Sequence, residues 1–336
     1  MTTKVMPFCG ESVKQAAEIL RNGGIVGIPT ETVYGLAADA RSEKAVRDIF
    51  AAKGRPQDNP LIVHISSMDM LPPLVKDIPE LAKRLAERFW CGPLTIIFDK
   101  SNLIPYTTSG GLNTVAVRMP SSEAARAIID ECGFPLAAPS ANLSGSPSPT
   151  TARHVYNDMN GKIPLIIDGG ECSVGVESTV ICLNENKIHI LRPGGVTAEM
   201  LSEFAEVEID KAVTSCHKEN ELVLSPGMKY KHYSPKAVVT IVDAHGEDFR
   251  DYCLAASEKN PEKKLVALGI GVNERGIFKD YGAASELQAH RLFSLLREAD
   301  DDNADIVLVE MPSVEGIGLA VYNRLLRAAA FKVVGV

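Results

Sequence analysis

The 336-residue sequence lacks the features that mark membrane, secreted and disulfide-stabilised proteins. No apolar run reaches the roughly 18 residues that a membrane-spanning helix needs, so no association with a membrane is expected. The N-terminal stretch MTTKVMPFCGES contains no hydrophobic core of the signal-peptide kind. The seven cysteines are scattered, odd in number and without a C-x-x-C pair, which favours reduced thiols. The sequence therefore predicts a cytoplasmic protein.

An excess of positive charge and several nucleotide-binding signatures are also missing. The net charge of −8 argues against a broad basic surface, so stable binding of nucleic acid is not expected. The chain has no G-x-x-x-x-G-K-[ST] loop, no complete G-x-G-x-x-G fingerprint and no G-x-S-x-G elbow. No pair of histidines has metal-ligand spacing, and no protein metal site is predicted. P-loop, dinucleotide-binding and serine hydrolase classes are thereby disfavoured.

The most informative stretch that is present runs from Gly23 to Asp39, GGIVGIPTETVYGLAAD. The apolar run Ile25–Ile28 predicts a short buried strand, which Pro29 ends. Three polar residues, Thr30–Thr32, follow before the chain turns apolar again. Polar side chains between two apolar pieces usually line a cleft, because buried hydroxyls and carboxylates must find partners. The alternative interpretation is a strand-end turn capped by threonine.

Cations and a histidine lie near the ends of the next predicted elements. Lys53 and Arg55 follow a helix predicted over residues 42–52, in the loop KGRPQDNP. Cations at a helix C-terminus suit the helix dipole, but in a loop fixed by Gly and Pro they also suit phosphate oxygens. His64 lies in an apolar strand, where a lone histidine is usually a hydrogen-bonded core residue. Arg118 ends another strand and suits a carboxylate or phosphate.

Hydroxyl and amide side chains recur after later strands. Ser140 and Asn142 follow a small-residue strand, and the Ser-rich run to Thr150 is either a plain loop or an anion-binding nest. Ser178 begins a strand, and Arg192 ends one. Together these strand-end residues suit an anionic ligand of nucleotide type.

The chain is predicted to consist of two α/β domains joined by a linker. The first spans residues 1–207, the linker or lid spans 208–236, and the last domain spans 237–336. The polar composition of the linker begins at residue 206, but two Tyr, a His and two Lys near its end are unlike a passive spacer. After residue 237, strands and helices alternate, which predicts a parallel sheet with helical crossovers.

Eight motifs in a fixed order resemble the threonylcarbamoyl-AMP synthase family, the Sua5/YrdC proteins. They are IPTETVYGLAADA, KGRPQDNPLIVHI, GPLTIIF, VAVRMP, APSANLSGSPSPT, DGG, GVESTV and LRPGG. SPGMKYKHYSP and the final α/β module resemble the longer, two-domain Sua5 form. The resemblance implies a YrdC-like twisted mixed sheet with a concave groove, followed by a small Rossmann-like parallel α/β domain.

The resemblance also implies a reaction. L-threonine, bicarbonate or CO2, and ATP would give L-threonylcarbamoyl-adenylate and pyrophosphate, which is the chemistry of a nucleotidyltransferase. A separate tRNA threonylcarbamoyl transferase would use the product to make t6A at position 37 of tRNA. No covalent enzyme intermediate is needed, so catalysis would consist of positioning and charge neutralisation. Mg²⁺ is expected with ATP, held by phosphates and water rather than by a protein cage.

The family pattern implies a role for each site residue. Threonine would be held by Thr32, His64, Arg118 and Ser178. The nucleotide would be held by Lys53, Arg55, Asn59, Ser140, Asn142, Ser148, Arg192, Tyr230 and Tyr233. Lys53 and Arg55 would carry the catalytic charge, and the two linker tyrosines would cover the nucleotide.

Two other functions stay open at this point. One is a non-catalytic module that binds double-stranded RNA, although the negative charge and the Thr/His/Ser content of the groove disfavour it. The other is a carbamoyltransferase, although the chain lacks the acylphosphatase-like and zinc-finger segments that accompany such a use. The oligomeric state and the role of the last domain are not determined by the sequence.

Overall fold

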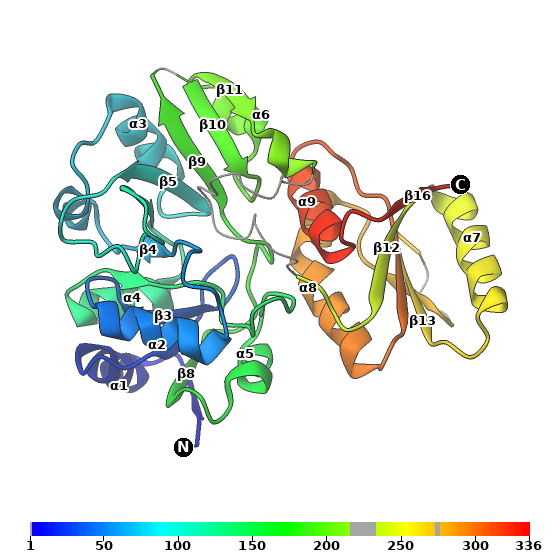
Figure 1. The fold of residues 1–336 in the computed structure, drawn as a ribbon, viewed down its shortest axis with the longest axis horizontal. Helices are drawn as coiled ribbons and strands as arrows, with labels where there is room; N and C mark the ends of the chain where they lie inside the picture. Colours follow the sequence, from blue (N-terminus) through cyan, green and yellow to red (C-terminus); the bar gives the residue numbers. More distant parts are fainter. Residues whose placement is uncertain (1, 186, 216–232, 273–275) are drawn as a thin grey trace. The chain divides into compact units, whose positions relative to one another are not determined.

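The computed structural model describes residues 2–185, 187–215, 233–272 and 276–336, which form two compact units (Figure 1). Among these residues, the first unit holds 2–144 and 148–213. The second unit holds 145–147, 214–215 and the described residues from 233 onward. Each unit is built on its own β-sheet.

The sheet of the first unit has eleven strands within the described ranges, in the order β1-β8-β2-β3-β7-β4-β6-β5-β9-β10-β11. The strands are Lys4–Pro7 (β1), Val26–Ile28 (β2), Gly35–Asp39 (β3), Ile62–His64 (β4), Leu94–Asp99 (β5), Thr114–Arg118 (β6), Leu136–Ala137 (β7), Leu165–Asp168 (β8), Thr179–Asn184 (β9), Lys187–Arg192 (β10) and Glu206–Ile209 (β11). Strand β1 pairs in parallel with β8, whereas β2 pairs in antiparallel fashion with β3. The predicted mixed sheet is thereby confirmed.

Helices cover both faces of this sheet. They are Gly10–Arg21 (α1), Glu43–Lys53 (α2), Glu80–Phe89 (α3), Glu123–Cys132 (α4), Ala152–Met159 (α5) and Ala198–Ser202 (α6), with short 3₁₀ turns at Met68–Met70, Pro72–Leu74 and Lys211–Val213. The Ser42 hydroxyl caps α2 by accepting the N–H of Ala45, as the sequence predicts. Gly54 ends α2 in the left-handed conformation, with φ of 61°.

The core of the first unit lies in two layers, one on each face of the sheet. Successive residues of a strand point to opposite faces. On β3, Leu36 and Ala38 join the larger apolar cluster, which includes residues of α2, α3 and α5. Ala37 joins the smaller cluster, which includes residues of α1 and α4. Helices α1 and α4 lie side by side over that second face (Figure 1).

Three neighbouring strands place polar side chains in a row. His64 on β4 pairs with Arg118 on β6, and Arg118 pairs with Thr95 on β5. Val63 and Val117, the residues just before His64 and Arg118, belong to the larger apolar cluster. Because strand side chains alternate, His64, Arg118 and Thr95 lie on the opposite face of these strands. The register of the sheet therefore assembles a polar surface from three distant parts of the sequence.

The end of the first sheet differs from the sequence prediction. Polar composition from residue 206 onward indicates a linker, but Glu206–Ile209 forms β11 and pairs in parallel with β10. Lys187 on β10 forms ion pairs with both Glu206 and Glu208. An edge strand with charged side chains resembles a linker in composition, which explains the error. Residues 216–232 of the predicted linker, Tyr230 included, lie outside the described residues.

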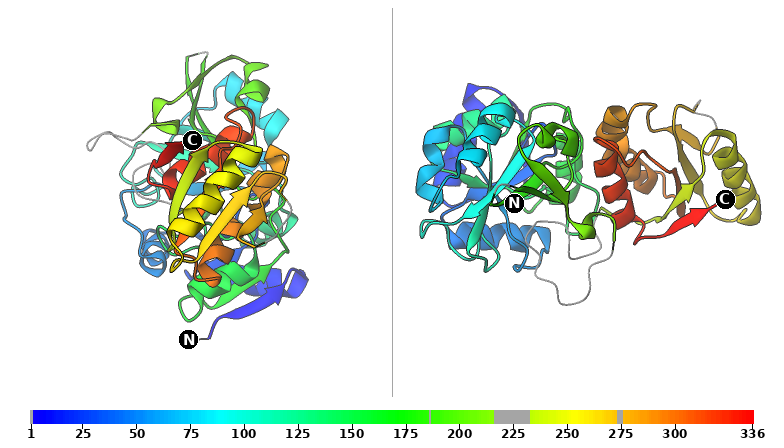
Figure 2. Two further views of the ribbon diagram at one scale, coloured as in Figure 1. Left: turned by 90° about the vertical axis from the view of Figure 1, so that its right-hand side faces the viewer. Right: turned by 90° about the horizontal axis from the view of Figure 1, so that it is seen from above.

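The second unit confirms the predicted parallel sheet. Its described residues form five strands in the order β14-β13-β15-β12-β16, and every pair is parallel. The strands are Val238–Asp243 (β12), Leu265–Gly269 (β13), Phe278–Asp280 (β14), Ile306–Glu310 (β15) and Val333–Gly335 (β16). The helices are Gly246–Lys259 (α7), Ser285–Asp301 (α8) and Gly318–Ala328 (α9). Helix α7 covers one face, and α8 and α9 cover the other (Figures 1 and 2).

Carboxylates bind the turn amides at the carboxyl edge of this parallel sheet. The buried Glu310 side chain accepts the N–H groups of Gly246 and Ile270 at 3.0 and 2.7 Å. Asp280 accepts those of Gly271 and Gly282, each at 2.9 Å. Parallel α/β sheets usually bind ligands at this edge through such amides. In this unit those amides are bonded to side chains of the chain itself.

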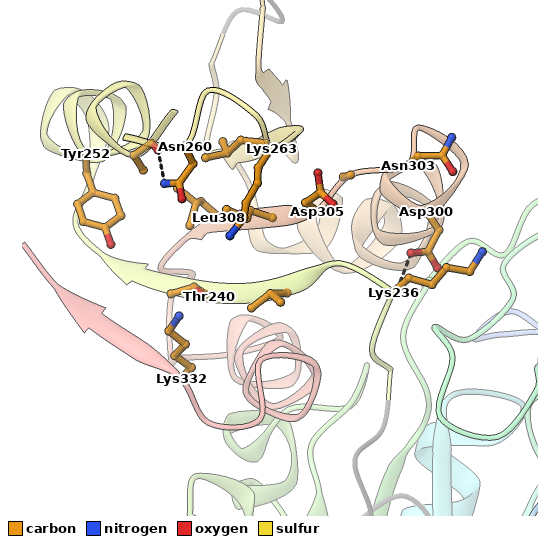
Figure 3. Close-up of a pocket in the computed structure, with 15 residues that line it drawn as sticks. Lys236, Thr240, Tyr252, Asn260, Lys263, Asp300, Asn303, Asp305, Leu308 and Lys332 are labelled. Carbon is orange, nitrogen blue, oxygen red and sulfur yellow. Dashed lines mark hydrogen bonds between the residues drawn. The ribbon is translucent and has the colours of Figure 1, made fainter. Parts of the chain in front are cut away.

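A cleft of about 710 Å³ opens at the amino ends of the same strands (Figure 3). Apolar and hydroxyl side chains of β12 and α7 line it, among them Thr240 and Tyr252. Lys263 and Lys332 lie on either side of β12 in the view of Figure 3. None of the described residues that the sequence assigns to threonine or the nucleotide lines this cleft.

Gly194 is required by a close approach of two backbones beside the polar row. A Cβ atom at this position would lie 2.3 Å from the Thr179 nitrogen and 2.5 Å from the Glu177 oxygen. Since both are backbone atoms, we expect Gly194→Ala to lower the free energy of unfolding by about 1–3 kcal/mol. Urea denaturation measures the change. Gly10→Ala is the control, because a Cβ there meets no atom within 4 Å. Equal stability of the two variants would contradict the close approach.

Candidate functional site

Arg118 is the centre of the polar row, and its guanidinium is held from three sides. Nη1 donates to the Thr32 hydroxyl at 2.8 Å, and Nε donates to the Gly92 carbonyl at 3.2 Å. Nη2 forms an ion pair with Oε1 of Glu31 at 2.6 Å. The side chains of Arg118 and Glu31 are only 4% and 6% exposed. A buried cation of this kind is fixed in direction and suits a carboxylate ligand.

His64 lies next to Arg118 in the register and is a neutral imidazole. Burial lowers the pKa of His64 to about 3, and the positive charge of Arg118 lowers it as well. Nδ1 of His64 has no hydrogen-bond partner among the residues that the structure describes. A buried, unsatisfied ring nitrogen costs free energy unless a ligand bonds to it. The unpartnered ring nitrogen is consistent with the role that the family resemblance implies for His64, which stays a prediction.

Ser178 joins the row through Thr95 and Arg192. Its hydroxyl lies 2.8 Å from the Thr95 hydroxyl, and Nη2 of Arg192 donates to it at 3.2 Å. Nε of Arg192 donates to the Ser178 carbonyl at 3.1 Å. Thr32, His64, Arg118 and Ser178 are thus brought to one region by direct contact or by adjacent positions in the sheet. Arg192, expected near the nucleotide, contacts the predicted threonine ligand Ser178.

A second group of predicted site residues surrounds the turn after β7. Lys53, the last residue of α2, donates from Nζ to the backbone carbonyls of Ser140 and Asn142. The Ser140 hydroxyl donates to Oδ1 of Asn142 at 2.6 Å. The Ala141 N–H donates to the Tyr34 carbonyl, which ties the turn to the loop after β2. The buried ammonium group therefore fixes helix α2 to the turn, and a backbone hydrogen bond fixes the turn to the loop.

The remaining nucleotide candidates flank these two groups. Arg55 donates to the Pro60 carbonyl at 3.4 Å, and Asn59 is buried with its Oδ1 lacking a partner among the described residues. The Ser148 hydroxyl donates to a carboxylate oxygen of Glu177, the neighbour of Ser178. Buried polar atoms at these positions are consistent with a polar ligand.

Tyr233 belongs to the second unit. Its ring packs against Phe293 with centroids 5.3 Å apart, and the guanidinium of Arg324 lies 5.9 Å from its centroid. Tyr233 is buried, and its φ of 63° lies in the left-handed region. The assignment of both tyrosines to the nucleotide stays a prediction. Tyr230 lies outside the described residues.

Three polar residues of this region receive no ligand role from the sequence. Glu31 and Thr30 lie within the motif IPTETVYGLAADA, where the sequence predicts polar side chains that line a cleft but a ligand role for Thr32 alone. Thr95 lies in GPLTIIF and bonds to Ser178. The signal for Glu31 was its charge between two apolar pieces, which requires a buried partner. The partner, Arg118, is 87 positions later, so no local pattern pairs them.

The described part of the chain contains no group of three or more His, Cys, Asp or Glu side chains that could hold a metal ion. None of its helices has both the length and the hydropathy to cross a membrane.

Two protein-family models match this chain. The Sua5/YciO/YrdC family model, described as "Telomere recombination", matches residues 18–194. A second model, "Threonylcarbamoyl-AMP synthase, C-terminal domain", matches residues 196–330. The two matches follow one another along nearly the whole chain.

Comparison with individual proteins gives the same result. The threonylcarbamoyl-AMP synthase of Pyrococcus abyssi is 46% identical over 327 residues, 96% of each chain. That of Bacillus subtilis is 42% identical over 330 residues, 96% of this chain and 94% of the relative. The crystal structure of P. abyssi Sua5 complexed with L-threonine has a TM-score of 0.94 and 44% identity, and the match covers 100% of both chains.

The neutral state of His64 gives a pH prediction. Because its pKa falls from 6.5 to about 3 on folding, we expect no titration of the ring between pH 5 and 8. NMR of the ring protons measures this directly. The unfolded chain binds the proton more tightly, so His64 should lower stability progressively as the pH falls from about 6.5 to about 3. A ring that titrates near 6.5 in the folded protein would contradict the buried, neutral imidazole.

Proposed function

This chain belongs to the threonylcarbamoyl-AMP synthase family, the Sua5/YrdC proteins, and on that premise we propose that it makes L-threonylcarbamoyl-adenylate. The substrates are L-threonine, bicarbonate or CO2, and ATP, and pyrophosphate is released. The observation that carries the proposal is the likeness, over the full chain, to a Sua5 protein crystallised with L-threonine. A non-catalytic RNA-binding module is not favoured, since the full-length relatives are synthases.

The polar row supports a threonine site with separate tasks for its residues. Arg118 pairs with the substrate carboxylate through N–H groups that Glu31 and Thr32 leave unused. Thr32 supplies a hydroxyl group that contacts Arg118, and Ser178 supplies one that contacts Thr95. His64 supplies a neutral ring nitrogen, which can bond to the substrate without adding charge. These groups recognise a small amino acid with a polar side chain.

The turn after β7 supports a nucleotide site beside it. Ser140, Asn142 and Ser148 supply hydroxyl and amide groups, and Lys53, Arg55 and Arg192 supply positive charge. Lys53 also holds the turn itself, because its Nζ is bonded to two backbone carbonyls. Replacing Lys53 should therefore lower stability as well as turnover. Arg55 is therefore a better residue than Lys53 for a test of phosphate binding.

The reaction needs positioning and charge rather than a nucleophile from the protein. The threonine amine combines with CO2 to form a carbamate and releases a proton. A carbamate oxygen then attacks the α-phosphorus of ATP, and the bond from the α-phosphorus to the bridging oxygen breaks as pyrophosphate leaves. This makes the enzyme a nucleotidyltransferase. Lysine and arginine side chains stabilise the charge that develops on the phosphates.

Further parts of the proposal concern the surroundings of the reaction. Mg²⁺ would accompany the triphosphate, held by phosphate oxygens and water, and would offset part of its charge. The product would pass to a separate tRNA threonylcarbamoyl transferase for t6A at position 37. Free thiols at the six described cysteines are consistent with the expected cytoplasmic location.

Pyrophosphate release tests the reaction and the role of Arg55 together. We expect release only when threonine, bicarbonate and ATP are all present. Arg55→Ala should lower kcat/KM by about 10²–10³, because removal of one phosphate contact costs roughly 2.7–4 kcal/mol in the transition state. Arg47→Ala is the control, since Arg47 is an exposed arginine of α2 that pairs with Glu43. Release without threonine would refute the proposed function, and a fully active Arg55→Ala would refute its phosphate contact.

Amino-acid preference tests the threonine site. If Thr32, His64 and Ser178 bind the substrate hydroxyl, kcat/KM should fall in the order threonine, serine, valine. Serine lacks only a methyl group, worth roughly 10–200-fold, whereas valine leaves the polar groups unpaired and should lose about 10⁴–10⁵. The measurement is pyrophosphate release at saturating ATP and bicarbonate. Valine used as well as serine would remove these three residues from the substrate site.

A further inference from the structure

A chain of hydrogen bonds runs from Arg118 through two buried threonines. Nη1 of Arg118 lies 2.8 Å from the hydroxyl oxygen of Thr32, and that oxygen lies 2.8 Å from the hydroxyl oxygen of Thr30. The Thr30 hydroxyl lies 2.6 Å from the carbonyl oxygen of Val33. Thr30 and Thr32 are 5% and 1% exposed, so solvent is largely kept from the chain.

The direction of every bond in this chain follows from its two ends. A guanidinium can only donate, and a backbone carbonyl can only accept. Thr30 must therefore give its single hydroxyl proton to the Val33 carbonyl. Thr32 must then donate its own proton to the Thr30 oxygen, while it accepts from Arg118. The Thr30 oxygen also accepts the N–H groups of Thr32 and Val33 at 3.2 and 3.3 Å. One lone pair of the Thr32 oxygen is left for a ligand, and no proton is left.

Glu31 fixes the position of Arg118, where the chain of hydrogen bonds begins. Its carboxylate pairs with Nη2 of Arg118 at 2.6 Å, while Nε of Arg118 bonds to the Gly92 carbonyl at 3.2 Å. These two contacts hold the guanidinium plane so that Nη1 stays against Thr32. Burial raises the pKa of the Glu31 carboxyl, but the charge of Arg118 and its hydrogen bonds outweigh burial and lower it. Glu31 is therefore an anion at neutral pH.

We infer that Glu31 and Thr30 are positioning residues that make Thr32 a hydrogen-bond acceptor for the substrate hydroxyl. The identity of the substrate rests on the proposed function, whereas the bond directions rest on geometry alone. An acceptor at Thr32 selects a ligand group that donates a proton. Threonine carries such a group at its β-carbon. Valine carries none, and neither does 2-amino-3-fluorobutanoate, in which fluorine replaces the hydroxyl.

The fluorinated analogue separates the two directions that a hydroxyl–hydroxyl contact could take. Fluorine is close in size to a hydroxyl and can only accept, weakly. If Thr32 donated to the substrate, the analogue would keep part of the interaction. Because Thr32 accepts, the analogue loses the interaction as completely as valine does. The ratio of the affinities for threonine and the fluorinated analogue therefore shows whether Thr32 accepts or donates the hydrogen bond to the substrate.

The experiment is calorimetric titration of the full chain with L-threonine, L-valine and the threonine-configured 2-amino-3-fluorobutanoate, without ATP. For the wild-type chain we expect both analogues to bind at least about tenfold more weakly than threonine. Thr30→Val releases the proton of Thr32, so the preference for threonine over the fluorinated analogue should fall by about threefold or more. Glu31→Gln keeps the shape but removes the charge, and should weaken threonine binding by about tenfold or more.

The controls are two variants that make the same kinds of substitution at residues outside this chain of hydrogen bonds. Thr3→Val removes a buried hydroxyl that donates to the Ile163 carbonyl at 2.6 Å and accepts the Gly161 N–H at 2.9 Å. Glu310→Gln removes a buried carboxylate charge in the second unit. Both should lower the melting temperature and leave the relative affinities for the three ligands unchanged. The same behaviour in Thr30→Val and Glu31→Gln would reduce those residues to a structural role and overturn the inference.

The outcomes separate this inference from the proposed function. Wild-type protein that binds the fluorinated analogue as tightly as threonine would overturn the acceptor assignment and leave the synthase reaction standing. Wild-type protein that binds none of the three amino acids would overturn both. Glu31→Asp adds a graded readout, since the shorter side chain keeps the charge but not the 2.6 Å contact with Arg118. Its threonine affinity should fall between those of the wild-type chain and Glu31→Gln.

Discussion

The buried ion pair between Arg118 and Glu31 is the interaction around which the first unit's polar region is arranged. Two charges this far from water are costly unless each is paired and bonded. Arg118 meets the requirement with a carboxylate, a hydroxyl and a backbone carbonyl. The carboxylate and the hydroxyl come from the loop after β2, and the carbonyl comes from the segment before β5, so Arg118 fixes both segments against β6. Removal of either partner leaves the other charge buried without compensation.

The sheet supplies the precision that this pair needs. His64, Arg118 and Thr95 are neighbours because β4, β6 and β5 are hydrogen-bonded in one register. A slip of one residue would turn these side chains into the apolar core and bring valines out in their place. Burial of the larger apolar cluster on one face of these strands therefore sets the register that places the polar side chains on the other face. Stability and function depend on the same alternation of side chains.

In the second unit, side chains of the protein itself accept the turn amides at the carboxyl edge of the parallel sheet. Glu310 and Asp280 accept the turn amides that commonly bind phosphate in folds of this kind. A nucleotide at that edge would have to displace two carboxylates. The predicted nucleotide ligands are instead concentrated in the first unit, where Lys53 holds the turn that carries Ser140 and Asn142. Likeness of fold alone would have suggested the carboxyl edge of the second sheet for the nucleotide, whereas the predicted ligands point to the first unit.

The sequence by itself determined most of the elements, the two kinds of sheet and the family. Hydrophobic periodicity and caps such as Ser42 are local signals, and the motifs stand in a fixed order. It did not identify β11, because a charged edge strand has the composition of a linker. Only the tertiary structure decided that Glu31 pairs with Arg118, that Thr32 accepts and that His64 is neutral. Ion pairing, bond direction and desolvation depend on distances between residues far apart in the chain, and no local pattern encodes those distances.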